Sequence, residues 1–145
     1  MGFEPIKILI NGEELSSDDD RQVSIYSPSF QYGLSILEGL RGYSHEGKIK
    51  LWELEPHIKR LIRSSKLIGF DLPVNIEKEI ENDVYKLTKN IPAEDIYLKF
   101  LLSYIQEGSW NTTRTPDRVA FIYPLKSNLR TSNNFPSAKG EFTSY

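Results

Sequence analysis

The sequence has no cysteine and only two histidines, His45 and His57. Without cysteine the chain forms no disulfide and has no thiolate nucleophile or ligand. Two imidazoles are too few for a histidine-rich metal centre, because zinc sites of that kind take three or more nitrogen or sulfur ligands. We therefore expect no metal site in this protein.

The chain also lacks an excess of charge of either sign and lacks long apolar runs. Its 18 Lys and Arg residues against 20 Asp and Glu residues give a net charge of −2, whereas a nucleic-acid binder needs a basic surface that displaces counterions. No apolar stretch approaches the ~18 residues of a membrane span, and the N-terminus does not have the basic and then apolar segments of a secretory signal. These features predict a cytoplasmic protein that binds neither nucleic acid nor membrane.

What the sequence does contain is the pattern of an α+β domain. Its 145 residues are 39% hydrophobic, enough for the core of one domain. Apolar segments predict strands at residues 6–10, 22–26, 41–44, 49–54, 96–105 and 119–123. Apolar residues at helical spacing predict helices at residues 55–68 and 75–87. Because strands precede and follow the helices, we expect a mostly antiparallel sheet with two helices on one face.

The composition changes after Pro124. Residues 127–134 are mostly polar and show no periodicity, which is typical of a linker. The last eleven residues, 135–145, are too few to form a domain by themselves. We therefore expect a domain at residues 1–124 and a linker at residues 125–145.

One helix and one strand carry side chains that stand out chemically. The first predicted helix has Arg60 and Arg63 away from its apolar stripe, and an arginine there could hold a phosphate by bidentate hydrogen bonds. Periodicity alone does not choose between Arg60 and Arg63, and it leaves open that both belong to a solvated basic face. In the strand at residues 96–105, alternation places Tyr97 and Lys99 on one face. A lysine on an apolar strand needs a partner, which an anionic ligand or water at the strand edge would provide.

Two further segments contain possible site residues. Lys139 follows the small residues Ser137 and Ala138, which would let it reach a site unobstructed. A lysine that forms an imine must be partly neutral near pH 7, a state favoured by desolvation or a neighbouring cation. Glu38 and Arg41 are each followed by a glycine, Gly39 and Gly42. Composition alone favours the interpretation that these are glycines of a turn beside two charged surface side chains.

Four segments together give a more specific indication. Residues 32–43 are Tyr-Gly-Leu-Ser-Ile-Leu-Glu-Gly-Leu-Arg-Gly-Tyr, and residues 54–61 are Leu-Glu-Pro-His-Ile-Lys-Arg-Leu. Residues 97–100 are Tyr-Leu-Lys-Phe, and residues 136–139 are Pro-Ser-Ala-Lys. In this order and spacing they resemble the signature segments of the class IV (fold type IV) aminotransferases, which depend on pyridoxal 5'-phosphate. Among these enzymes the branched-chain amino acid aminotransferases are the most similar.

The resemblance implies transfer of an amino group between an amino acid and a 2-oxo acid. It implies that Lys139 is the catalytic residue, which holds the aldehyde of the cofactor as an imine and moves the α-proton of the substrate. It also implies that Arg60, and not Arg63, binds the cofactor phosphate. The implied substrate-binding residues are Tyr32, Leu37, Tyr97 and Lys99, with Glu38 and Arg41 as supporting residues behind them. The family further implies a homodimer.

Three positions depart from the family pattern. Leu37 replaces a phenylalanine, Lys99 replaces the carboxylate-binding arginine and loses its bidentate geometry, and Thr143 stands where asparagine is usual. Two alternatives therefore stay open, an aminodeoxychorismate lyase-like enzyme of the same fold and a non-catalytic binding or dimerisation module. In the family a second domain completes the cofactor site, so we expect this chain to be the N-terminal part of a longer protein, with the interdomain linker and the start of that second domain at residues 125–145.

Overall fold

The computed structural model describes residues 4–16 and 22–125, so the predicted linker beyond residue 125, and Lys139, lie outside the described residues. The strands are β1 (Lys7–Ile10), β2 (Glu13–Glu14), β3 (Ser35–His45), β4 (Lys48–Leu51), β5 (Ile96–Ser103) and β6 (Asp117–Pro124). The helices are α1 (Pro28–Tyr32), α2 (Leu54–Leu67) and α3 (Ile76–Thr88). None of these described helices combines the length and apolar character that a membrane span needs.

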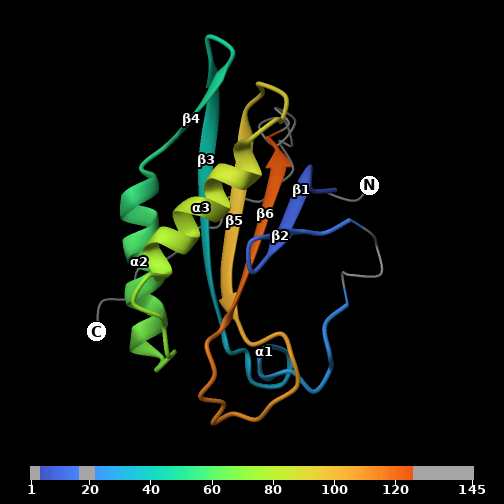
Figure 1. The fold of residues 1–145 in the computed structure, drawn as a ribbon, viewed down its shortest axis with the longest axis vertical. Coiled ribbons are helices and arrows are strands. Elements are labelled where there is room, and N and C mark those ends of the chain that lie inside the picture. The colour runs from blue at the N-terminus through green and yellow to red at the C-terminus, as the bar shows by residue number, and fades with distance from the viewer. Residues whose placement is uncertain (1–3, 17–21, 126–145) are drawn as a thin grey trace, which may run out of the picture.

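The strands form one six-stranded sheet in the order β2-β1-β6-β5-β3-β4, and every neighbouring pair is antiparallel. In Figure 1, α3 crosses in front of this sheet, α2 lies beside β3 and contacts α3, and the short α1 lies at one end of the sheet. The predicted α+β fold, with an antiparallel sheet and two longer helices on one face, is confirmed.

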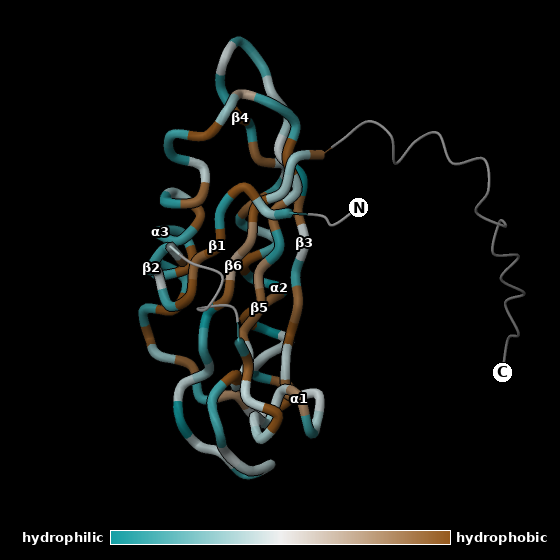
Figure 2. Tube along the Cα trace, turned by 90° about the vertical axis from the view of Figure 1, so that its right-hand side faces the viewer, coloured by the Kyte–Doolittle hydropathy of each residue, from teal (hydrophilic) through white to brown (hydrophobic). Residues whose placement is uncertain are grey.

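Strand alternation gives the sheet two different faces. In β5, Leu98 and Leu102 are buried, whereas the side chains of Tyr97, Lys99 and Leu101 are partly exposed. We call the side that α2 and α3 cover the helix face, and the opposite side the open face. In Figure 2, a view turned by 90°, α1 lies at one end of the molecule and β4 lies at the other. The core lies at the helix face and includes Leu9, Leu40, Ile58, Leu61, Phe70, Ile80, Val84, Leu87, Leu98, Leu102 and Ile122.

Two tight turns join neighbouring strands. Asn11 and Gly12, between β1 and β2, have φ angles of 51° and 84°, and Glu46 and Gly47, between β3 and β4, have φ angles of 49° and 73°. Two successive residues with positive φ are the mark of a type I′ turn, whose twist matches that of antiparallel strands. The second turn joins the strands predicted at residues 41–44 and 49–54, and Asn-Gly in the first turn is a dipeptide that this turn type favours.

The structure corrects two of the predicted elements. Residues 22–26 form no strand. The helix α1 follows them, with Pro28 at its start and a hydrogen bond from the Phe30 N–H to the side chain of Ser27. β3 begins at Ser35 rather than at residue 41, because Gly39 is a strand residue and not a turn residue. Because glycine has no side chain, Tyr97 of the neighbouring strand β5 fits against it.

Buried ion pairs attach α3 to the sheet. Arg118 of β6 donates from Nε to Asp83 at 2.8 Å and from Nη1 to Glu79 at 2.5 Å. Asp83 is 3% exposed. Lys7 of β1 donates to the carbonyl oxygens of Lys86 and Lys89, where the last turn of a helix leaves carbonyls without partners.

Candidate functional site

One stretch of β3 has a strand neighbour on only one side. β5 pairs with β3 from Ser35 to Gly42, but β4 pairs only with the part from Gly42 to His45. α2 packs beside this stretch on the helix face (Figure 1). We call this stretch of β3, together with the part of α2 that packs beside it, the margin of the sheet. Side chains from both faces of β3 reach the margin. Most of the predicted site residues in the described part of the chain lie there.

On the helix face of this margin, Glu38 of β3 meets Arg60 and His57 of α2. Arg60 donates from Nε to Oε1 of Glu38 at 2.5 Å and from Nη2 to Oε2 at 2.8 Å. This parallel fork is the strongest arrangement of an arginine with a carboxylate. Nδ1 of His57 lies 3.0 Å from Oε2 of Glu38. Both side chains reach one carboxylate because helix residues three apart lie on the same side.

The three side chains differ in their exposure to water. The side chain of Glu38 is 10% exposed and that of His57 is 19% exposed, whereas that of Arg60 is 62% exposed. The hydrogen bond from Arg60 lowers the pKa of Glu38 more than burial raises it, and His57 lowers this pKa further. The same bond raises the pKa of Arg60. Glu38 is therefore an ionised carboxylate inside the protein, and it holds an arginine whose outer edge faces water.

On the open face, the ring of Tyr97 lies over Gly39. A Cβ atom added to Gly39 would overlap the Tyr97 hydroxyl and would lie 2.7 Å from Cζ of the ring. Tyr97 is on β5, directly opposite Arg41, and its side chain lies along β3 towards Gly39. Sequence reasoning placed this glycine in a turn, but in the structure it lies in β3 and leaves space for the Tyr97 ring to pack against the strand.

Lys99 lies on the same face as Tyr97, as the alternation predicts, and opposite Gly39. Its ammonium is 5.6 Å from the centre of the Tyr123 ring, an attractive cation–π arrangement. Burial raises the pKa of Tyr123, and the neighbouring Tyr97 raises it further. Within the described ranges no carboxylate lies at ion-pair distance from Lys99. An anion could therefore bind at Lys99.

Leu37 and Arg41 also point to the open face of β3, where both are exposed. Leu37 lies opposite Leu101, and Arg41 lies opposite Tyr97. The two predicted supporting residues, Glu38 and Arg41, are thus on opposite faces of the sheet. Glu38 supports Arg60 directly, whereas Arg41 lies with Tyr97 on the open face.

Tyr32 does not join this group. It is the last residue of α1, at the end of the sheet where Ser35 pairs with Ser103. Gly39, beside which the Tyr97 ring and Lys99 lie, is four residues along β3 from Ser35, which is roughly 13 Å at the usual rise of a strand. One copy of the chain therefore does not place Tyr32 beside Tyr97 and Lys99.

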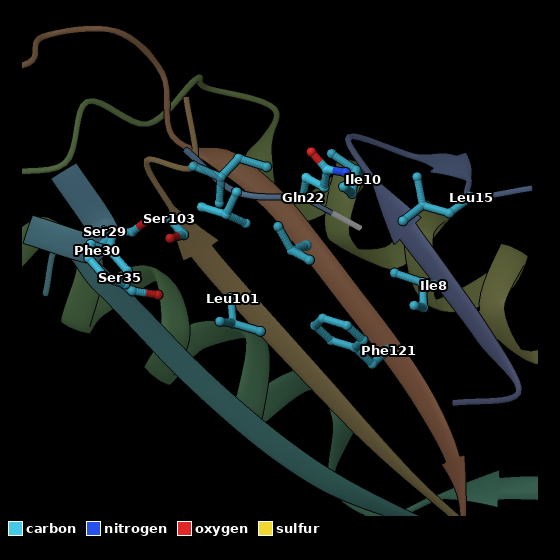
Figure 3. Close-up of a pocket in the computed structure, with 13 residues that line it drawn as sticks. Ile8, Ile10, Leu15, Gln22, Ser29, Phe30, Ser35, Leu101, Ser103 and Phe121 are labelled. Carbon is cyan, nitrogen blue, oxygen red and sulfur yellow. The ribbon is translucent and has the colours of Figure 1, made fainter. Parts of the chain in front are cut away.

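The open face has an apolar hollow of about 410 Å³ at the α1 end (Figure 3). Side chains of β1, β5, β6 and α1 line it, among them Ile8, Ile10, Phe30, Leu101, Val119 and Phe121. Phe30 is 69% exposed, and the nearby loop between β5 and β6 carries Trp110, which is 73% exposed. Large apolar side chains exposed together mark a surface that another molecule or domain covers.

Sequence reasoning assigned His57 no role of its own, although its spacing of three from Arg60 puts both on one side of a helix and it belongs to the segment at residues 54–61 that resembles the family. The described residues contain no group of three or more His, Asp or Glu side chains placed to hold a metal ion.

The chain is similar to known aminotransferases along most of its length. It is 30% identical over 119 residues to a probable branched-chain-amino-acid aminotransferase from Aquifex aeolicus, a match that covers 79% of this chain and 38% of that protein. It is 36% identical over 95 residues to the D-alanine aminotransferase of Staphylococcus epidermidis, a match that covers 64% of this chain and 32% of that protein. No protein-family model matches the chain.

The fold leads to the same group. The branched-chain aminotransferase of the archaeon Thermoproteus uzoniensis, solved with norvaline, matches with a TM-score of 0.72 at 24% identity. This match covers 83% of our chain and 41% of that chain. Another branched-chain aminotransferase, solved in complex with N-(5'-phosphopyridoxyl)-L-glutamate, matches with a TM-score of 0.74 at 18% identity.

In fold and sequence the chain is similar to the N-terminal domain of the fold type IV aminotransferases. Its relatives within this class are branched-chain and D-alanine aminotransferases. The chain spans about two fifths or less of the length of the relatives it matches.

Similarity to these aminotransferases implies pyridoxal phosphate as a cofactor, and the described residues fit its phosphate end. A guanidinium has five N–H donors, of which the fork to Glu38 uses two. Nη1 of Arg60 has no hydrogen-bond partner among the described residues, and the side chain is mostly exposed. An arginine held on one edge and free on the other is suited to bind a phosphate.

Proposed function

We propose that the chain is the N-terminal part of a branched-chain-like aminotransferase, which transfers an amino group between an amino acid and a 2-oxo acid with pyridoxal 5'-phosphate. The observation that carries this proposal is the margin of β3. There a guanidinium held by a buried carboxylate lies on one face, and Tyr97 and Lys99 lie on the other. The similarity to branched-chain and D-alanine aminotransferases supports it.

In this proposal each residue has a defined task. Arg60 binds the phosphate of the cofactor through the donors that Glu38 leaves unused. Lys139, which lies outside the described residues, binds the cofactor covalently and moves the proton of the substrate α-carbon through its Nζ. When bound, the cofactor supplies an electron sink that stabilises negative charge at that carbon.

The substrate would lie against the open face of the margin. Lys99 binds a carboxylate group as a single point charge, Tyr97 offers a hydroxyl over Gly39, and Leu37 forms part of the side-chain pocket. Arg41 adds a second positive charge across from Tyr97. Two cations on one face suit an acid substrate with a negatively charged group at each end.

We further propose that the protein is a cytoplasmic homodimer. Tyr32 lies before the Ser35 end of β3, and roughly 13 Å of strand separates Ser35 from Gly39, beside which Tyr97 and Lys99 lie. The apolar hollow lies at the Tyr32 end of the same open face. A second copy seated there would cover the hollow, and Tyr32 would then serve the site of that copy. The domain boundary after Pro124, with a linker at residues 125–145, stays a prediction.

Lys99 also favours a second candidate, the aminodeoxychorismate lyase-like enzyme, because a lysine in place of arginine leaves room for a different acid. Amino transfer from branched-chain amino acids and from glutamate, measured beside pyruvate release from aminodeoxychorismate in the intact protein, separates the two. We expect transfer that requires pyridoxal phosphate and falls strongly in Arg60→Ala. Pyruvate release without transfer would indicate the lyase, and no saturable cofactor binding would indicate a non-catalytic module.

A further inference from the structure

We propose that His57 is a positioning residue, which acts through Glu38 to hold Arg60 in the orientation that receives the cofactor phosphate. This inference rests on the proposed function, because it takes Arg60 as the phosphate ligand. The side chain of His57 is mostly shielded from water on the helix side of the margin. Its only side-chain hydrogen-bond partners among the described residues are Glu38 and Arg60.

The first step concerns the carboxylate of Glu38. Oε1 accepts from Nε of Arg60, and Oε2 accepts from Nη2. His57 approaches the same Oε2 from one helical turn earlier, at 3.0 Å. With partners from two residues of α2, the carboxylate plane has little freedom to rotate, and the plane of the guanidinium that is forked to it is fixed as well.

The second step concerns the two possible states of the imidazole. Nδ1 of His57 lies 3.0 Å from Oε2 of Glu38 and 3.1 Å from Nη2 of Arg60. A protonated Nδ1 donates to the carboxylate, whereas an unprotonated Nδ1 accepts from the guanidinium. Either bond ties the ring to the fork, and neither uses Nη1 of Arg60. His57 therefore restrains the arginine and leaves both N–H groups of Nη1 for the phosphate, and only the accepting state of the ring also uses the second N–H of Nη2.

The third step concerns what this restraint achieves. An arginine side chain is flexible, and ordering it when a ligand binds costs affinity. Arg60 is 62% exposed, so packing alone does not order it. The bonds through Glu38 and His57 order it before the ligand arrives. Loss of His57 should therefore weaken binding of ligands that carry a phosphate and leave other ligands unaffected.

The test compares pyridoxal phosphate with pyridoxal, which lacks the phosphate, in the intact protein and in three variants. Asparagine places its amide near the position of Nδ1, and glutamine places its amide nearer Nε2. His57→Asn is therefore the rescuing variant, and His57→Gln is its matched control beside His57→Ala. Absorbance titration gives the dissociation constant of each ligand, and a thermal melt of each variant establishes that it is folded.

We expect His57→Ala and His57→Gln to lower the preference for pyridoxal phosphate over pyridoxal about tenfold, through weaker phosphate binding alone. His57→Asn should keep the preference within about twofold of the original protein. An unchanged preference in His57→Ala, or an equal loss for both ligands, would overturn the positioning role. If His57→Ala does not fold, equal preferences in the Asn and Gln variants would overturn it too. If the original protein itself shows no preference for pyridoxal phosphate, the proposed function fails first.

Discussion

Replacing Gly39 with alanine should displace Tyr97 from the open face. The added Cβ would lie 2.7 Å from Cζ of the ring and closer still to the hydroxyl. Non-bonded carbon atoms prefer about 3.5 Å, so the ring has to move by about 0.8 Å or more. Gly39 is not among the glycines with positive φ, so alanine meets no backbone penalty there and the cost is steric.

The size of the effect follows from how easily the ring can move. Overpacking a core costs about 1–3 kcal/mol, and Tyr97 is half-buried on the open face, so it can swing outward. We expect Gly39→Ala to lower the free energy of unfolding by about 1 kcal/mol, the low end of that range. Urea unfolding of the intact protein measures this value.

A double-mutant cycle decides whether Tyr97 is the cause. In a Tyr97→Ala background the clash is gone, and alanine at position 39 should become neutral or stabilising by about 0.5 kcal/mol, since it restricts the unfolded chain. Gly39→Ala should also weaken binding of the amino acid substrate in the protein that keeps Tyr97, and should have no such effect in the Tyr97→Ala variant. If Gly39→Ala costs the same free energy in both backgrounds, the ring does not lie over Gly39 in solution.

Three other changes test the margin and its support. Because Arg60 lowers the pKa of Glu38 below its ordinary value of 4.5, the stability that this carboxylate provides is present above pH 4.5 and is lost as the pH falls through the lowered pKa. Glu38→Gln should therefore lower the free energy of unfolding by about 1 kcal/mol at pH 7 and leave it unchanged at the acid end of a series of urea unfolding curves. A difference in free energy that stays constant across pH would contradict this. Asp83→Ala leaves Arg118 with only Glu79 at a mostly buried position, so it should destabilise the fold by about 3 kcal/mol; a loss under about 1 kcal/mol in urea would show that the ion pair is not buried in solution. Lys99→Arg restores bidentate carboxylate binding and should lower the KM for glutamate about fivefold; an unchanged KM would place the carboxylate elsewhere.

Local patterns in the sequence were enough to predict much of the fold. The alternation in β5 correctly places Tyr97 and Lys99 on one face, and the helical spacing of apolar residues correctly predicts α2 and α3. Both depend only on residues close together in the chain. α1 was missed because five residues that begin with proline show no helical period. The start of β3 was misplaced because glycine is usual in turns and rare within strands.

The candidate site depended on contacts that no local pattern shows. Arg60 and Arg63 have equivalent positions in the sequence pattern, and only Arg60 reaches Glu38, which is 22 residues away in the chain. Arg63 instead lines a shallow groove on α2 with Lys59 and Lys66. The resemblance to the aminotransferases chose Arg60 by analogy, and the structure supplies a physical reason, a buried carboxylate that needs a cation. The separation of Tyr32 from Tyr97 likewise depends on the register of β3 and β5.

The most direct measurement concerns Lys139, which the proposal makes the covalent anchor of the cofactor. The intact protein is incubated with pyridoxal phosphate, reduced with borohydride, digested and mapped by mass spectrometry, with Lys139→Ala treated in parallel. We expect the phosphopyridoxyl group on the peptide that contains Lys139 and on no peptide of the variant. A label on another lysine, such as Lys99, or no label at all would contradict the proposed aminotransferase.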